Sequence, residues 1–201
     1  MLSDSVTSLR LEGRSMELMP ALEIGWLNGW MPLGLLVLVE GLLFKVFPKE
    51  VGARLFDRSG WSKKQAAFTV VGKLFSLACL ALIVFTPLKV GSGSFVVGAV
   101  LYALGLVGLV VAIFDFRNTP PGRPVTRGLY TVSRHPQIVM LFVIFLGMCL
   151  AIGSWLALLT LLMSRVLQHF GILAEEEVCL AQYGESYRAY MKRVPRYFFF
   201  F

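Results

Sequence analysis

Charged residues are scarce in this sequence. They make up 15% of its 201 residues, whereas 57% are hydrophobic and the mean hydropathy is +0.73. A water-soluble domain of this size has no core large enough to hide so many apolar side chains. The composition therefore predicts an integral membrane protein.

Cysteines, polar linkers and a cleavable signal are also lacking. Of the three cysteines, Cys79 and Cys149 fall inside apolar runs, and the spacing fits neither a disulfide framework nor a metal site. We therefore expect no bound metal. No Ser-, Gly- or Pro-rich stretch longer than a few residues divides the chain, so we predict a single membrane domain over residues 1–201. The first apolar run has no cleavage site and is interpreted as a retained span.

The abundant apolar residues fall, between positions 24 and 172, into runs of membrane-spanning length, for which roughly 20 helical residues suffice. Residues 24–47, 67–88 and 95–116 each form one such run. The preceding residues 1–20 are polar and of mixed charge, and we expect them to form a loose or surface-lying arm.

The last apolar run, residues 138–167, is too long for one typical span. Gly153 and Ser154 divide it, which predicts a helical hairpin of residues 137–152 and 154–172. Together with the three earlier runs, this gives an all-α polytopic membrane protein. We predict about five transmembrane helices, of which the last two form the hairpin.

Lysine and arginine are distributed unevenly among the connections. With five spans, the basic loops 49–64 and 117–134 and the tail from residue 173 lie on one side, whereas the other side carries Lys89 and an arm richer in acids. Short cytoplasmic loops carry an excess of these residues. We therefore predict an N-terminus outside and a C-terminus in the cytosol. We interpret the basic loops as orientation signals and expect no nucleic-acid partner.

Two polar segments flank the predicted hairpin. Residues 127–136 read R-G-L-Y-T-V-S-R-H-P, and the tail contains E-E-E, Y-G-x-x-Y-x-x-Y and V-P-R. Because two antiparallel spans return the chain to the face it left, we expect both segments at one membrane face. The expected neighbours are Tyr130, Arg134 and His135 from the first segment and Glu175, Glu176 and Tyr187 from the second.

The order of these motifs resembles that of membrane-embedded methyltransferases typified by isoprenylcysteine carboxyl methyltransferase, with phospholipid N-methyltransferases as neighbours. The resemblance covers roughly residues 114–197, and the first two spans match only as hydrophobic segments. No single motif is specific. Their complete order at this spacing indicates the superfamily, but it does not indicate a particular substrate.

This resemblance implies an S-adenosylmethionine site formed by the cytosolic segments 117–136 and 173–201, with a lipid-like or prenylated acceptor entering sideways from the bilayer. In the family the cofactor is held by the positions that match Gly122, Arg123, Pro124, Val125, Tyr130, His135, Pro136, Gln137, Ile138 and Glu175. We add Arg134, Glu176 and Tyr187 to this set as expected neighbours. A sulfonium cation favours aromatic faces, ribose hydroxyls suit a carboxylate, and a carboxylate suits Arg or His.

The sequence departs from the family pattern in two places. Ile138 stands where an aromatic residue is usual, and Gly171 stands where the carboxyl methyltransferase has an arginine near its substrate. Arg165 and His169, one helical turn apart, are the candidate replacements, and we name them as candidate catalytic residues. Otherwise the acceptor is an amine, a thiol or another lipid head group.

Other interpretations stay open at this point. A similar His-Pro and C-terminal Tyr/Val-Pro arrangement occurs in NADPH-dependent sterol-type reductases, and a small membrane scaffold could keep the shape without a cofactor. His135 could cap a helix beside Pro136, and Glu175 and Glu176 could be a solvated cluster at a new helix start. The tyrosines could form an interfacial belt. The oligomeric state is left open.

Overall fold

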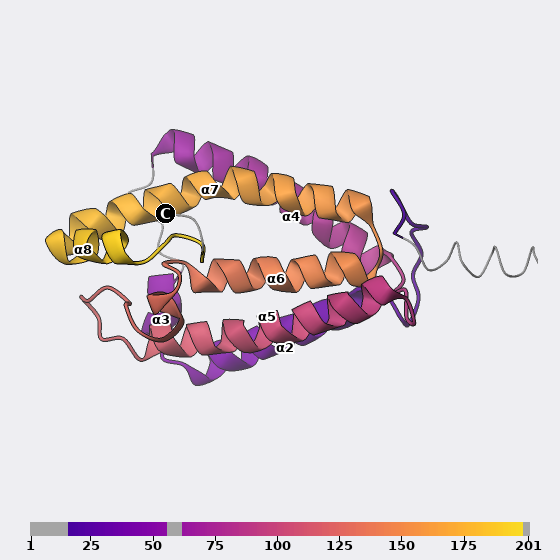
Figure 1. Cartoon of the computed structure of the whole chain (residues 1–201), viewed down its shortest axis with the longest axis horizontal. Helices are drawn as coiled ribbons and strands as arrows, with labels where there is room; N and C mark the ends of the chain where they lie inside the picture. Colours follow the sequence, from indigo (N-terminus) through magenta and orange to yellow (C-terminus); the bar gives the residue numbers. More distant parts are fainter. Residues whose placement is uncertain (1–15, 56–61, 199–201) are drawn as a thin grey trace, which may run out of the picture.

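The computed structural model describes residues 16–55 and 62–198, and in this part of the chain the regular structure is helical (Figure 1). The helices are α2 (Trp30–Val46), α3 (Lys49–Leu55), α4 (Lys63–Phe85), α5 (Gly93–Arg117), the 3-10 helix η1 (Gly128–Thr131), α6 (Pro136–Ala151), α7 (Trp155–Tyr183) and α8 (Glu185–Arg193). The predicted all-α class is confirmed. Parts of the predicted arm (1–15), basic loop (56–61) and tail (199–201) lie outside the described residues.

Each predicted span coincides with a helix. Within the described residues, three segments are long and apolar enough to cross a membrane, namely Gln65–Phe85, Gly93–Arg117 and Trp155–Tyr183. The other two, α2 with 17 residues and α6 with 16, are shorter than the roughly 20 residues that a perpendicular span takes. The count of five spans therefore stays a prediction.

The first span begins later than the sequence pattern indicates, at Trp30 instead of residue 24. The preceding residues are tied to the end of α4. The buried Asn28 side chain donates to the carbonyl oxygens of Glu23 (2.6 Å) and Val84 (3.4 Å). The backbone N–H groups of Glu23 and Gly29 donate to the carbonyls of Phe85 and Thr86, so the segment is held against the end of α4 without an added helical turn.

The last span continues well beyond residue 172. Helix α7 ends at Tyr183, and Gly184 follows with φ 56°. The three glutamates Glu175, Glu176 and Glu177 thus lie within a continuous helix, so their interpretation as the start of a new helix is wrong. No residue in this stretch breaks a helix before Gly184, whose left-handed conformation suits glycine.

The bundle consists of two closely packed helix pairs, α5 with α6 and α4 with α7. Glycines allow the close approach. A Cβ atom at Gly98 of α5 would overlap the carbonyl oxygen of Gly147 in α6, and one at Gly72 of α4 would lie 3.0 Å from Gln168 Cγ in α7. Small residues serve the same purpose at other helix interfaces in membranes. A cavity lies between the two pairs.

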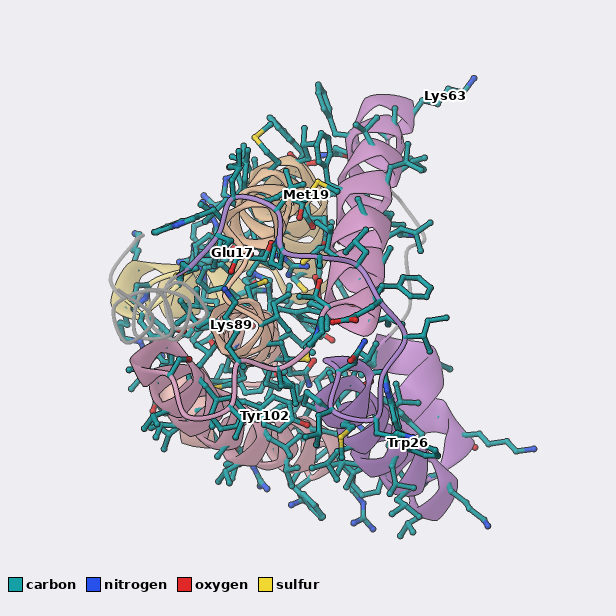
Figure 2. All side chains as sticks on the ribbon, turned by 90° about the vertical axis from the view of Figure 1, so that its right-hand side faces the viewer. Glu17, Met19, Trp26, Lys63, Lys89 and Tyr102 are labelled. Carbon is teal, nitrogen blue, oxygen red and sulfur yellow. The ribbon has the colours of Figure 1, made fainter. Side chains whose placement is uncertain are left out.

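The two ends of the bundle differ in character. The turn before α5, the turn between α6 and α7, and residues 16–29 lie at one end, where Lys89 Nζ pairs with Glu17 Oε1 at 2.6 Å (Figure 2). The Glu17 backbone carbonyl accepts from the backbone N–H of Trp155 at 2.8 Å. Helices α3 and α8 and the loop with η1 lie at the opposite end (Figure 1). The hairpin therefore returns the chain to the end that carries the polar motifs.

Candidate functional site

A cavity of about 920 Å³ lies between the helix pairs and extends into the end that carries η1 and α8. Its walls from the long helices are mostly apolar, with Leu36, Leu80, Leu109, Leu141 and Phe145 among the lining residues. Its walls near the polar end come from residues 121–125, from His135, Gln137 and Ile138 at the start of α6, and from Tyr187 and Tyr190 of α8. A single cavity thus joins a polar wall to an apolar one.

Most of the residues predicted for the site line this cavity. They are Gly122, Arg123, Pro124, Val125, Tyr130, Arg134, His135, Gln137, Ile138, Arg165, Glu175 and Tyr187. Pro136, His169 and Glu176 are not among the lining residues. The hairpin geometry expected from the sequence accounts for this agreement, since it brings the loop before α6 to the residues that follow the middle of α7.

The position of Tyr130 in the wall depends on a contact between η1 and the end of α5. The backbone N–H of Leu129 donates to Asp115 Oδ2 at 3.0 Å. Gly128 has φ 56°, and a Cβ atom there would overlap the Asp115 carboxylate. The Tyr130 carbonyl accepts a hydrogen bond of 2.7 Å from Tyr190 Oη. The loop is therefore held from α5 on one side and from α8 on the other.

His135 is placed by the start of α6. Pro136 occupies the first helical position, where its missing N–H costs nothing. The His135 backbone carbonyl accepts from the N–H of Ile138 at 3.1 Å, but the His135 side chain makes no capping hydrogen bond. The side chain is buried and turns instead to α7. A role as a helix cap therefore does not explain this histidine.

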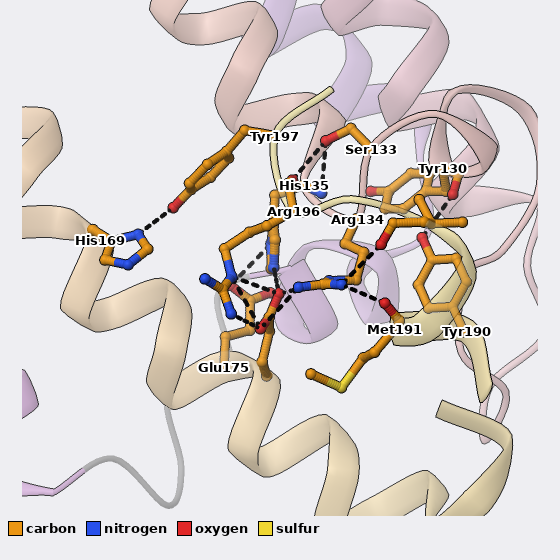
Figure 3. A network of polar contacts seen from close by, with 12 residues as sticks. Tyr130, Ser133, Arg134, His135, His169, Glu175, Tyr190, Met191, Arg196 and Tyr197 are labelled. Atoms are coloured by element: carbon orange, nitrogen blue, oxygen red, sulfur yellow. Dashed lines mark hydrogen bonds and ion pairs between the residues drawn. The ribbon is translucent and has the colours of Figure 1, made fainter. Parts of the chain in front are cut away.

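A buried carboxylate connects three parts of the chain at this point. Glu176 Oε1 accepts from Arg134 Nε at 2.8 Å, and Glu176 Oε2 accepts from Arg196 Nη2 at 2.8 Å. His135 Nε2 lies 3.2 Å from Glu176 Oε1. Figure 3 shows Arg134 and Arg196 reaching this network from two sides. A charge at this depth is stable only when it is paired, so removal of one partner leaves an uncompensated charge.

The C-terminal segment 194–197 is fastened to the same loop by backbone contacts. The Arg134 backbone N–H donates to the Pro195 carbonyl at 2.9 Å, Arg134 Nη1 donates to the Val194 carbonyl at 2.8 Å, and Ser133 Oγ donates to the Arg196 carbonyl at 2.8 Å. The sequence shows the V-P-R motif but no role for Arg196. Its ion pair with Glu176 becomes visible only when the chain is folded.

The two neighbouring glutamates, Glu175 and Glu176, differ in how far their side chains are buried. The side chain of Glu175 is 48% exposed and lines the cavity, whereas that of Glu176 is 4% exposed. Glu175 Oε2 lies 3.9 Å from His135 Nδ1, on the other edge of the imidazole from Glu176. The pair is therefore not a uniform solvated cluster.

Arg165 and His169, the two candidate replacements for the arginine missing at Gly171, also have different surroundings. Arg165 lines the cavity, whereas His169 Nδ1 lies 2.7 Å from Tyr197 Oη in the C-terminal segment. Tyr197 packs against His169, one helical turn from Arg165. Arg165 thus faces the cavity, whereas His169 contacts the C-terminal segment.

Two buried donors in the cavity wall have no hydrogen-bond partner within the described residues. They are Gln137 Nε2, near the start of α6, and Arg165 Nε, in the middle of α7. Buried polar atoms are nearly always paired, by protein or by ordered water. The two donors are therefore available to acceptor atoms of water or of a bound ligand.

Tyr187 and Tyr190 of α8 are buried in the wall together with Tyr130. Removal from water raises the pKa of all three phenols above their ordinary value, so they stay neutral at physiological pH. The Tyr187 and Tyr190 rings lie 5.7 Å apart. Their burial argues against an exposed interfacial belt.

Several lining residues were not identified from the sequence. Glu40, Lys73 and Gln168 line the cavity from α2, α4 and α7. A charged residue within an apolar run is the signal that could have found the first two, because such residues in membrane helices usually face a cavity or a partner. Within the described residues no group of three or more His, Cys, Asp or Glu is placed to hold a metal ion.

Comparison with known proteins agrees with this arrangement. The family model described as phospholipid methyltransferase matches residues 80–186, just over half of the chain. The chain is therefore an integral membrane protein and belongs to the phospholipid methyltransferase family.

A Protein-S-isoprenylcysteine O-methyltransferase from Schizosaccharomyces pombe is 39% identical to the chain over 74 residues. The match covers 35% of this chain and 30% of the yeast protein, so it spans less than a third of that relative. No solved structure matches the chain. The superfamily resemblance predicted from the motifs is confirmed.

Proposed function

We propose that this protein transfers a methyl group from S-adenosylmethionine to a lipid-like or prenylated acceptor in the membrane. The observation that carries the proposal is the single cavity whose polar wall meets an apolar wall between the helices. A water-soluble donor and a lipid acceptor need such adjoining surfaces if their reacting atoms are to be aligned away from water.

The polar wall suits the proposed donor. Glu175 offers a carboxylate to ribose hydroxyls, and the unpaired Gln137 Nε2 offers a hydrogen bond to an acceptor atom. The neutral rings of Tyr187 and Tyr190 present faces that attract a cation. When bound, S-adenosylmethionine would supply an electrophilic methyl group. The chain itself would bind the donor, orient it and exclude water.

The apolar wall suits an acceptor with a hydrocarbon chain. Helices α2 and α4 contact each other much less than the members of either helix pair do, and residues from both line the cavity. An acceptor could therefore enter between them from the bilayer. Arg165, with its unpaired Nε, is the residue that we assign to the acceptor head group. We place the polar end of the bundle in the cytosol, in agreement with the basic connections at that end.

Calorimetry on the detergent-purified protein tests the donor. We expect binding of S-adenosylmethionine and S-adenosylhomocysteine and no binding of NADPH. Binding of NADPH alone would favour a reductase, and binding of none of the three would favour a scaffold. His135→Ala and Glu175→Ala should each weaken adenosyl binding in a folded protein. Glu185→Ala, which removes an exposed partner of Arg188, is the matched control. Unchanged affinity in both site variants would contradict the proposed site.

The acceptor is tested separately. Membranes supplied with isotopically labelled donor should gain the label in a lipid-soluble product, which mass spectrometry identifies. Arg165→Gln should reduce this labelling while adenosyl binding stays unchanged, because Arg165 is assigned to the acceptor alone. A parallel loss of adenosyl binding would contradict that assignment.

A further inference from the structure

The Glu176 carboxylate has no proton to donate while it is paired with two arginines. It accepts from Arg134 and from Arg196, and the third group within hydrogen-bond distance is His135 Nε2, at 3.2 Å. A nitrogen lone pair directed at this carboxylate would be repelled. His135 must therefore carry its proton on Nε2 to fit this geometry.

We propose that Glu176 is a positioning residue, which fixes the ring orientation and the Nε2–H form of His135 without touching the ligand. The proposal rests on the proposed function, because it assigns a role to Glu176 in the donor site. Glu176 and Arg196 are absent from the cavity wall, whereas His135 lines it. Glu176 thus acts from behind the wall.

The geometry defines what is positioned. With Nε2 held by Glu176, the opposite edge of the ring, at Nδ1, lies on the side of Glu175, which lines the cavity; at 3.9 Å this carboxylate is beyond hydrogen-bond distance and does not select the protonated nitrogen. The same carboxylate holds the Arg134 side chain, whose Nη1 donates to the carbonyl oxygens of Met191 (2.9 Å) and Val194 (2.8 Å) at the end of α8. Glu176 therefore fixes both the histidine edge and the end of the helix that carries the wall tyrosines.

A glutamine at position 176 would have nearly the same shape but different chemistry. Its amide has one acceptor oxygen and one donor group, so it cannot accept from three donors as a carboxylate does. An NH2 group facing His135 Nε2 favours a ring that is protonated on Nδ1 alone. Glu176→Gln thus tests the hydrogen-bond pattern with little change in packing volume.

Nitrogen-15 NMR of protein labelled at histidine reads the ring state directly. The chain has two histidines, so His169→Gln leaves a spectrum that belongs to His135. We expect chemical shifts of a ring protonated on Nε2, and we expect this pattern to change in Glu176→Gln. Glu177→Gln is the matched control, since Glu177 contacts Gln65 and not the histidine. A wild-type ring protonated on Nδ1 alone would overturn the proposal, even if Glu176→Gln did not fold.

Calorimetry with S-adenosylhomocysteine links the ring state to binding. Glu176→Gln should weaken binding about tenfold or more, the size expected when a hydrogen bond to a charged group is lost. Glu177→Gln should bind as the wild type does. If the wild type binds no adenosyl compound, the proposed function fails. If the wild type and Glu176→Gln bind equally well, the role assigned to Glu176 is contradicted and the proposed function stands.

Discussion

Gly128 is a residue at which the loop before α6 tolerates no side chain. Its φ of 56° lies in the left-handed region, and the place of a Cβ atom is taken by the Asp115 carboxylate. That carboxylate accepts from Leu129 N–H and sets the position of Tyr130 in the cavity wall. The glycine is thus needed for the shape of the site.

Gly128→Ala should therefore destabilise the protein by more than backbone strain alone, which costs about 1–3 kcal/mol. Gly91→Ala is the control, because Gly91 also has positive φ (85°) but has nothing within 4 Å of the Cβ position. Thermal unfolding in detergent should show a larger loss for Gly128→Ala. It should also show weaker adenosyl binding for that variant only. Equal losses of stability would mean that Asp115 moves aside at no cost.

The neighbouring glutamates show the limit of sequence analysis at this scale. The motifs placed Glu175 and Glu176 near His135, and the structure brings all three together. The sequence gives no means to tell which glutamate faces the cavity. That choice depends on the rotation of α7 against the loop, which is set by packing along the whole helix.

Among the elements, α5 and α6 come into close backbone contact at Gly98 and Gly147. The atoms that crowd a Cβ at Gly98 belong to the backbone of α6, which cannot rotate away as a side chain can. The two helices must separate if a larger residue is introduced. Because the cavity lies between this pair and the α4 and α7 pair, their separation would also change the cavity.

Gly98→Leu should therefore reduce stability by at least the roughly 1–3 kcal/mol typical of overpacking. Gly34→Leu is the matched control, since Gly34 lies in α2 with nothing within 4 Å of the Cβ position. Unfolding by denaturing detergent measures both variants. A Gly98→Leu protein as stable as Gly34→Leu would show that the helices adjust without cost.

Hydrophobic patterning predicted these elements well, but not their ends. It located each apolar helix, because long apolar runs must form helices in lipid. It missed the extension of α7 to Tyr183 and the late start of α2 at Trp30. The end of α7 depends on Gly184, and the start of α2 depends on the hydrogen bond from Asn28 to Val84 of α4; hydropathy reports neither.

At the scale of the whole molecule, the two polar segments lie at one end of the bundle and the turn before α5 lies at the other (Figure 1). If the bundle spans the membrane, this arrangement fixes which loops share a face. We expect Arg127→Cys and Ser186→Cys to react with a membrane-impermeant maleimide from the cytosolic side. Val90→Cys should react from the opposite side. The unmodified chain, which has three free cysteines, is the background control.

Labelling of Arg127→Cys and Ser186→Cys from opposite sides would contradict both the orientation and the single site. The Tyr190 Oη hydrogen bond to the Tyr130 carbonyl requires these segments to be adjacent. Labelling of both from the outer side would retain the site but reverse the predicted orientation. The experiment therefore tests separately whether the two segments share a membrane face and whether that face is cytosolic.

The sequence by itself determined that the protein is helical, that it belongs in a membrane and that its polar motifs meet, because apolar runs of this length admit few other arrangements. The tertiary structure decided which side chains enter the cavity and which support it from behind. Helix rotation and the path of the C-terminal segment set those contacts, and both arise from packing between residues far apart in the chain.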